Sequence, residues 1–197
     1  MEEALRHLRR KDPILKALIS RVGPYAIDYH PPTFHALTRA IVYQQLSGKA
    51  AATIFRRFQD CCGVRTLKPE SILVLSDEQM RAAGLSGQKV RYIRDLAEKT
   101  ASGGLRFGRH KKLSDDEIIA ELTEVKGIGV WTVQMFLMFA LKRPDVFPVL
   151  DLGVRNGMQR VYGLDPAARH EDYTAIAENW RPYRSVASWY MWRSLEI

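Results

Sequence analysis

Apolar positions recur along the chain at helical spacing, and no segment shows the strict alternation of a β-strand. Residues that favour helix ends mark where several helices begin. Asp12 and Pro13 predict the start of a helix that runs through Arg21, and Thr33 predicts the start of another over 34–45. Other helices are expected at 50–58, 69–75, 77–83, 173–180 and 182–194. The segment 84–100 is expected to be a small glycine turn followed by a long helix, and the first eleven residues a short helix or a frayed end. We therefore expect an all-α fold.

The segment 118–141 carries the most informative pattern. An amphipathic stretch is followed by two glycines around one apolar residue, and then by a strongly apolar helix. Gly127 and Gly129 can both take positive φ and allow another backbone to approach closely. A helix, a tight hairpin and a second helix direct several backbone N–H groups at one phosphate. After an extended stretch, Asp151 begins a third helix, so a phosphate-binding hairpin followed by a carboxylate is predicted, although the glycines alone would also suit a plain helical turn.

The composition points to a globular protein with a polyanionic partner. The chain has 197 residues, 46% of them hydrophobic and 26% charged, which suits one domain or two closely joined subdomains. The formal net charge of +8 favours binding to nucleic acid. No apolar run approaches the roughly 20 residues needed to span a bilayer, and the first residues lack the apolar region of a secretory signal. We therefore expect no contact with membranes.

The cysteines and histidines indicate no metal centre. Cys61 and Cys62 are adjacent, which disfavours a structural disulfide and favours a reduced, intracellular protein. An iron–sulfur cluster normally takes four cysteine ligands, so two are too few. The five histidines lack metal-ligand spacing. The stretch 103–113, rich in Gly, Arg and Lys, is interpreted as a solvated linker or a phosphate contact, and Ser114 with Glu117 forms a capping box after it.

Three local sequences resemble the helix-hairpin-helix DNA glycosylase superfamily, and within it the compact members of the 3-methyladenine DNA glycosylase II family. They are QQLSGKAA (Gln44–Ala51), GIGVWT (Gly127–Thr132) and WRPYRSVASWYMW (Trp180–Trp192). The resemblance implies a helical glycosylase fold of two subdomains with an active-site cleft between them. One subdomain is expected over about 33–140, with the hairpin at 118–141, and the other over about 1–32 plus 141–197.

The resemblance assigns the chemistry to Asp151. Breaking an N-glycosidic bond builds positive charge on the deoxyribose, which an anion stabilises. Asp151 would stabilise this sugar and orient the attacking water, a role compatible with capping the helix that follows. Relatives that also cut the DNA backbone carry a lysine two residues after the second hairpin glycine, where this chain has Trp131. Without that amine no Schiff base forms, so a monofunctional enzyme is expected.

Trp131 and Trp192 match aromatic residues of the family's base pocket, and Met135 stands where the family commonly has another aromatic. Indole faces attract a cationic, alkylated base by roughly 0.5–2 kcal/mol each. The alternative for these tryptophans is a role in the core alone. The expected DNA contacts are Gln44, Gln45, Leu46, Ser47, Lys126, Gly127, Gly129 and Thr132. Either Gln45 or Leu46 would be the wedge that fills the gap left by the flipped nucleotide.

These features together predict a monomeric enzyme that excises alkylated purines of the 3-methyladenine type from double-stranded DNA, in base excision repair. No cofactor is expected beyond a monovalent cation, which hairpins of this family often hold on backbone carbonyls. The alternatives are a non-catalytic DNA-binding protein with the same hairpin and a glycosylase for oxidised or mismatched bases. Asp151 and the tryptophans disfavour the first alternative, and the missing hairpin lysine disfavours the second. The expected location is the cytoplasm of a bacterium or the nucleus of a eukaryote.

Overall fold

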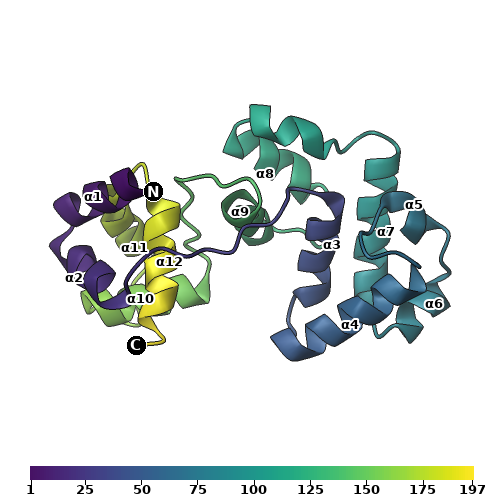
Figure 1. Cartoon of the computed structure of the whole chain (residues 1–197), viewed down its shortest axis with the longest axis horizontal. Coiled ribbons are helices and arrows are strands. Elements are labelled where there is room, and N and C mark those ends of the chain that lie inside the picture. The colour runs from purple at the N-terminus through teal and green to yellow at the C-terminus, as the bar shows by residue number, and fades with distance from the viewer. The chain divides into compact units, whose positions relative to one another are not determined.

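The computed structural model describes all 197 residues, and every regular element is helical (Figure 1). The all-α expectation is therefore confirmed. The elements are α1 (Glu2–Lys11), α2 (Pro13–Val22), α3 (Phe34–Tyr43), α4 (Gly48–Cys61), α5 (Pro69–Leu73), α6 (Asp77–Ala82), α7 (Gly87–Ala101), the 3₁₀ helix η1 (Phe107–Lys112), α8 (Asp115–Thr123), α9 (Val130–Phe139), α10 (Leu152–Tyr162), α11 (His170–Ala177), the 3₁₀ helix η2 (Glu178–Trp180) and α12 (Arg184–Ser194). None of the helices has the length and apolar character needed to cross a membrane.

The chain forms two units. The split unit comprises Met1–Tyr29 and Leu137–Ile197, and the hairpin unit comprises His30–Phe136. The sequence placed these boundaries near 33 and 140. The second boundary falls inside α9, so one helix supplies residues to both units.

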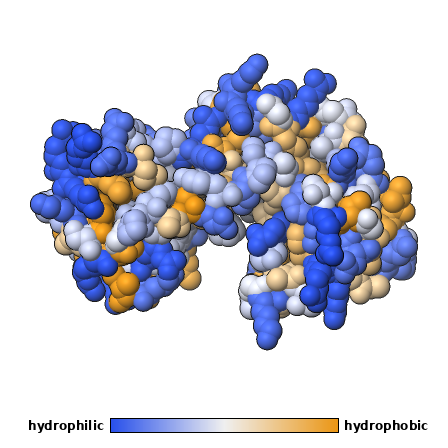
Figure 2. All heavy atoms as spheres, in the orientation of Figure 1, coloured by the Kyte–Doolittle hydropathy of each residue, from blue (hydrophilic) through white to orange (hydrophobic).

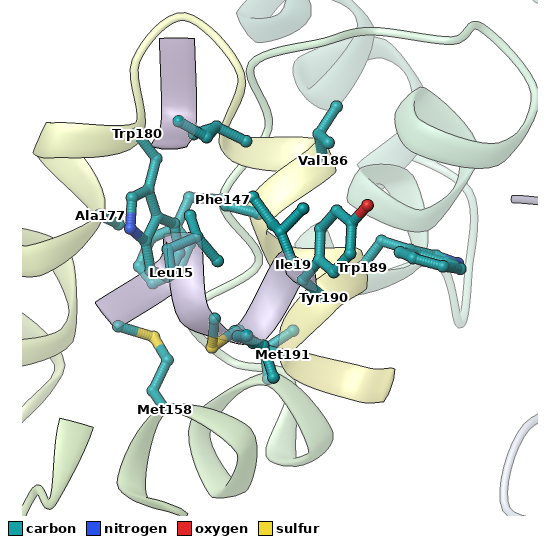
Figure 3. Close-up of a cluster of buried hydrophobic side chains, with 14 of the residues drawn as sticks. Leu15, Ile19, Phe147, Met158, Ala177, Trp180, Val186, Trp189, Tyr190 and Met191 are labelled. Atoms are coloured by element: carbon teal, nitrogen blue, oxygen red, sulfur yellow. The ribbon is translucent and has the colours of Figure 1, made fainter. Parts of the chain in front are cut away.

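The split unit has a core built from both ends of the chain. Figure 3 shows side chains of α2, α10, α11 and α12 packed together. Buried Asp12 joins these segments, because its Oδ1 accepts the Leu15 N–H (2.9 Å) while its Oδ2 accepts the Tyr162 hydroxyl (2.6 Å) and the Trp180 indole N–H (3.1 Å). Burial, together with the Asp12 carboxylate, raises the pKa of the Tyr162 hydroxyl. This fully bonded carboxylate ties the N-terminal helices to the C-terminal ones.

The hairpin unit is a cluster of helices whose buried positions follow the predicted periodicity. Its fully buried apolar side chains include Leu37, Ile41, Phe58, Ile72, Met80, Ile93, Leu96, Ile118 and Leu122. The predicted N-caps are confirmed for α3, where Thr33 accepts the Ala36 N–H, and for α8, where Ser114 and Glu117 form the capping box. These local signals set the helix starts.

Two expectations for the hairpin unit were wrong. The helix predicted over 34–45 ends at Tyr43, and the chain then turns, with Gln44 outside the helical conformation (φ −54°, ψ 132°) and Gln45 at a left-handed φ of 57°. The stretch 103–113 is not simply a solvated linker, because it contains η1 and buries His110. The His110 Nε2 lies 3.1 Å from Glu121 Oε1, and Arg109 donates to Oε2 of the same carboxylate at 2.6 Å. Because the stretch is rich in polar residues, the sequence did not reveal that part of it is held against α8 by these contacts to Glu121.

Hydrophilic residues dominate the face shown in Figure 2, with hydrophobic residues between them. Several of the exposed apolar side chains stand at, or next to, residues that the sequence predicts to be functional. Leu150 and Leu152 flank Asp151 and are 50% and 63% exposed, and Trp131, just after the hairpin, is 40% exposed. Exposed apolar groups beside predicted functional residues are typical of a binding surface.

Candidate active site

Asp151 is held by its own helix and by α12. Its Oδ1 accepts the backbone N–H of Val154 at 2.8 Å, which confirms that Asp151 is the N-cap of α10. The same oxygen accepts the indole N–H of Trp192, also at 2.8 Å. These two bonds fix the orientation of the carboxylate. Capping and the predicted catalytic role therefore coincide in one side chain.

Trp192 is itself fixed on two sides. Its ring stacks on Phe139 with centroids 5.7 Å apart and planes 22° from parallel. Gly153 leaves room for it, because a Cβ at that position would lie 2.8 Å from the indole Cδ1. The sequence predicted Trp192 as a pocket residue through its aromatic face, and did not predict the hydrogen bond of its N–H to Asp151. That bond depends on packing between residues 41 positions apart, for which the local sequence carries no signal.

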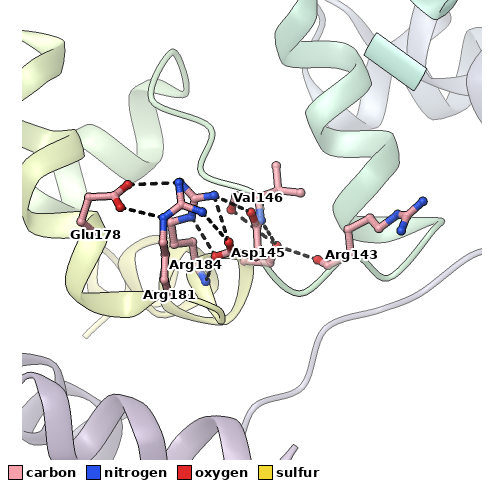
Figure 4. Close-up of polar contacts among 7 residues, drawn as sticks. Arg143, Asp145, Val146, Glu178, Arg181 and Arg184 are labelled. Carbon is pink, nitrogen blue, oxygen red and sulfur yellow. Dashed lines mark hydrogen bonds and ion pairs between the residues drawn. The ribbon is translucent and has the colours of Figure 1, made fainter. Parts of the chain in front are cut away.

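Helix α12 also holds the start of the extended segment that leads to Asp151 (Figure 4). The Arg184 guanidinium donates to Asp145 Oδ1 at 2.8 Å and Oδ2 at 3.0 Å, and to the Asp145 carbonyl at 2.9 Å. The Ser185 hydroxyl donates to the Arg143 carbonyl (2.7 Å) and accepts the Val146 N–H (2.9 Å). Helix α12 thus holds both ends of the segment that leads to Asp151. Arg184 and Ser185 bind its first residues, and Trp192 binds Asp151 at its end. Asp145, Arg184 and Ser185 were not among the residues predicted from the sequence to be functional.

The hairpin glycines differ from each other. Gly127 has a φ of 78°, as predicted, and a Cβ there would lie only 2.0 Å from a ring carbon of Tyr92. Gly129, which could also take positive φ, does not do so. Gly129 precedes α9, its carbonyl accepts the Val133 N–H at 3.1 Å, and a Cβ there would meet no atom within 4 Å. Gly127 is therefore required by the fold, whereas the fold places no such demand on Gly129.

The backbone N–H groups at the start of α9 remain the predicted phosphate-binding groups. The first N–H groups of an α-helix lack partners within the helix and lie at the positive end of its dipole. Gly129 and Thr132 lie at this helix start, and Thr132 is 5% exposed. The neighbouring Lys126 has an exposed side chain, and its backbone N–H donates to Asp95 at 2.9 Å.

We call residues 44–47 the wedge loop. Gln44 turns inward, because its side-chain Nε2 donates to the Gly127 carbonyl at 2.9 Å and lies 3.5 Å from the Thr132 hydroxyl. Ser47 caps α4 through its hydroxyl. Gln45 and Leu46 are exposed. Ser47 is exposed as well, so three of the four predicted contact residues in this loop are accessible to solvent.

A pocket of about 550 Å³ in the hairpin unit gathers several predicted residues. The wedge loop contributes Gln44 and Gln45, and the hairpin with α9 contributes Gly127, Trp131, Thr132 and Met135. Helix α7 contributes Gln88, Lys89 and Tyr92, and α3 contributes Ala40 and Tyr43; the sequence predicted none of these five as site residues. The structure thus brings the predicted residues together in two groups, one around this pocket and one around Asp151 and Trp192.

The monovalent cation at the hairpin carbonyls remains a prediction. The Val125 carbonyl accepts the Ile128 N–H, and the Gly127 carbonyl accepts the Gln44 amide. A carbonyl oxygen has a second lone pair, which can coordinate a cation. No group of three or more His, Cys, Asp or Glu residues in the structure could hold a metal ion. A cation bound to these carbonyls would add positive charge beside the expected phosphate.

Comparison with known proteins decides the family. The model of the HhH-GPD superfamily of base excision DNA repair proteins matches residues 38–182. The chain belongs to this superfamily. It is 36% identical over 197 residues to DNA-3-methyladenine glycosylase 1 of Schizosaccharomyces pombe, and the match covers 97% of this chain and 86% of that protein. The resemblance inferred from the sequence is therefore confirmed.

Solved structures agree with this assignment. The structure of the Schizosaccharomyces pombe 3-methyladenine DNA glycosylase in complex with abasic DNA matches with a TM-score of 0.86 and 35% identity, and covers 99% of this chain and 97% of that one. The DNA-3-methyladenine glycosidase of Bacillus halodurans matches with a TM-score of 0.88 and 36% identity, covering 96% and 87%. The expected helical glycosylase fold is confirmed.

Proposed function

We propose that this protein is a monofunctional DNA glycosylase that flips out and excises alkylated purines of the 3-methyladenine type from double-stranded DNA. The observation that carries the proposal is the Asp151 carboxylate, oriented by Val154 and Trp192 in a chain of the base excision repair superfamily. The named relatives are 3-methyladenine glycosylases, which supports the substrate class. A non-catalytic DNA-binding protein would need no such carboxylate.

Asp151 acts on the sugar in this proposal. The bond between C1′ and the base breaks with its electron pair passing to the base, so a base that carries a positive charge leaves as a neutral molecule. The deoxyribose becomes oxocarbenium-like, and the carboxylate stabilises that charge. Water then forms a bond to C1′, and Asp151 accepts its proton and passes it to solvent. A cationic leaving group requires no general acid.

Trp131 explains why the DNA backbone stays intact. It occupies the position at which bifunctional relatives carry their nucleophilic lysine. The nearby Lys126 precedes the hairpin glycines, and its ammonium lies 3.7 Å from the Asp95 carboxylate. With no amine at the nucleophile position, the sugar forms no Schiff base and β-elimination does not follow.

The hairpin unit binds the DNA and the base in this proposal. Backbone N–H groups at the start of α9 contact one phosphate, and the exposed Gln45 or Leu46 fills the gap in the duplex. Trp131 and Met135 line the pocket that receives the base, where the indole face favours a cation. The smaller, flexible Met135 in place of an aromatic adapts the pocket to bases of differing shape. We propose that the protein acts as a monomer, on nucleoid DNA in a bacterial host or in the nucleus of a eukaryotic one.

The test is base release from duplex oligonucleotides that carry one defined lesion. We expect free methylated purine to appear, an abasic site with an intact strand, and strand scission only after alkali is added. Undamaged duplex and duplex with oxidised guanine serve as controls. Absence of any base release would support the non-catalytic alternative. Faster release of oxidised guanine, or a covalent complex trapped by borohydride, would support the second alternative, a glycosylase for oxidised or mismatched bases.

A further inference from the structure

One face of helix α7 contacts both the wedge loop and the hairpin. The Tyr92 ring lies against Gly127, and the Asp95 carboxylate accepts the backbone N–H of Lys126. One turn further, Lys99 donates to the Glu124 carbonyl at 2.8 Å, just before the hairpin. Positions three and four apart share one side of a helix, so these contacts form a single ridge. The same ridge continues toward the start of α7 with Lys89.

Lys89 directs its ammonium at the end of α3. Its Nζ donates to the carbonyl of Val42 at 2.6 Å and to that of Gln44 at 2.8 Å. The last carbonyls of an α-helix lack partners within the helix, and a cation there interacts favourably with the helix dipole. Burial lowers the pKa of the Lys89 ammonium. A partly buried ammonium with two backbone acceptors is a structural clamp, whereas a lysine that binds phosphate would present its charge to solvent.

The clamp acts where the wedge loop changes direction. The Gln44 carbonyl is held by Lys89, and the Gln44 side chain is held by the Gly127 carbonyl. Between these anchors and the cap of α4, Gln45 adopts a left-handed conformation that costs energy for a residue with a side chain. Gln45 and Leu46 are exposed as a result. The two anchors keep the loop at a fixed distance from the hairpin that grips the phosphate.

We propose that Lys89 is a positioning residue for base flipping, which holds the wedge loop in the conformation that fills the duplex after the base has left. This inference rests on the proposed glycosylase function. The wedge contributes when a paired, stacked base must be displaced, and little when the base is already unpaired. Lys89 should therefore matter for lesions in normal pairs and hardly at all for lesions opposite an abasic site.

Single-turnover excision of the same methylated purine in these two contexts tests the proposal. Lys89→Met should slow excision from the paired lesion by about tenfold, the effect of about 1.4 kcal/mol. Excision opposite the abasic site should stay within about threefold of wild type. Lys89→Arg, which can donate to both carbonyls, should restore most of the rate. A fluorescent adenine analogue beside the lesion should show less unstacking with Lys89→Met than with wild type.

Controls separate this role from charge and from folding. Arg91→Met removes one positive charge from an exposed position of the same helix and should affect both contexts equally. Thermal melting reports folding, and Lys89→Gln, which keeps one amide donor, replaces the methionine variant if that variant does not fold. An equal loss in both contexts overturns the proposal. The proposal is also overturned if the salt dependence of DNA binding shows that Lys89→Met has lost about one phosphate contact, because Lys89 would then be a DNA contact.

Failure of the proposed function has a different signature. If wild-type protein releases methylated base in neither context, the glycosylase proposal falls. The fluorescence measurement still tests Lys89 in that case, because unstacking by the wedge loop requires no bond cleavage. Equal fluorescence for wild type and Lys89→Met would then overturn the positioning role as well.

Discussion

The two units of this protein hold their functional groups in opposite ways. In the hairpin unit the predicted phosphate-binding hairpin and the wedge loop are segments of main chain that side chains of α7 hold in place. In the split unit the predicted catalytic group is a side chain, Asp151, which is held by a backbone N–H and by Trp192. From this difference we expect DNA binding to depend on the conformation of the main chain in the hairpin unit, and catalysis to depend on the charge of one side chain in the split unit. Substitutions should therefore separate the two.

The largest loss of activity is expected from a substitution that changes few atoms, Asp151→Asn. Asp151→Asn removes the negative charge but keeps a good helix cap, so the fold of α10 should survive. We expect base release to fall at least ~100-fold, the scale of losing a key electrostatic stabiliser. Affinity for duplex DNA should stay near that of wild type. Near-normal excision by this variant would exclude Asp151 as the catalytic carboxylate.

A second substitution in the split unit tests the bond to that carboxylate. Trp192→Phe keeps an aromatic ring beside Phe139 but removes the N–H that Asp151 accepts. A hydrogen bond to a charged group contributes roughly 1.5–3 kcal/mol, so kcat should fall by about tenfold or more. KM should change little if the bond positions the carboxylate. A rise in KM with normal kcat would instead assign Trp192 to base binding alone.

The two glycines provide a matched pair in the hairpin unit. Gly127→Ala places a Cβ against Tyr92 at a left-handed position, so we expect a loss of stability of about 1–3 kcal/mol and weaker binding to every DNA sequence. Gly129→Ala meets no protein atom and should leave the melting temperature unchanged. Weaker binding by Gly129→Ala in the absence of destabilisation would indicate close approach of a phosphate. Equal melting temperatures for both variants would contradict the role assigned to Tyr92.

The smallest effect concerns the anchor between α7 and the hairpin. Burial raises the pKa of Asp95, but hydrogen bonds from Lys99 and from the Lys126 N–H outweigh it and hold the pKa below the ordinary 3.8. A carboxyl with a lowered folded-state pKa stabilises the fold above its unfolded pKa, and this contribution disappears as the pH falls through the folded pKa. Asp95→Asn should cost about 1 kcal/mol at neutral pH and nothing at pH values below the folded pKa. Urea unfolding of both proteins across the acid range measures this convergence.

The sequence predicted the features that depend on neighbours in the chain. The caps at Asp12, Thr33, Ser114 and Asp151 each satisfy N–H groups three residues away, so the local pattern was sufficient. The family resemblance then supplied the roles of the hairpin and of Asp151. These roles were assigned because the residues occupy matching positions in the family's sequence motifs, and the roles of the individual site residues stay predictions.

Features that depend on distant contacts could not be predicted in this way. Lys89, more than 40 residues further along the chain, binds the carbonyl of Val42 at the end of α3. The left-handed turn at Gln45 could not be predicted either, because no glycine occupies that position. Gly127 and Gly129 look equivalent in the sequence, but only Gly127 packs closely against a side chain, that of Tyr92. In each case the missing information was the identity of the side chain packed against the backbone.

The noncontiguous core of the split unit has a consequence for synthesis on the ribosome. Its N-terminal helices emerge first, yet Asp12 bonds to Tyr162 and Trp180, and the Gly23 carbonyl accepts the hydroxyl of Tyr190. The hairpin unit is continuous and can complete its core while the remaining chain is still being made, since domains fold as they emerge. The first two helices therefore keep their apolar faces exposed until α10, η2 and α12 have been synthesised. We expect nascent chains that stall before α12 to carry a folded hairpin unit and an N-terminal segment that chaperones recognise.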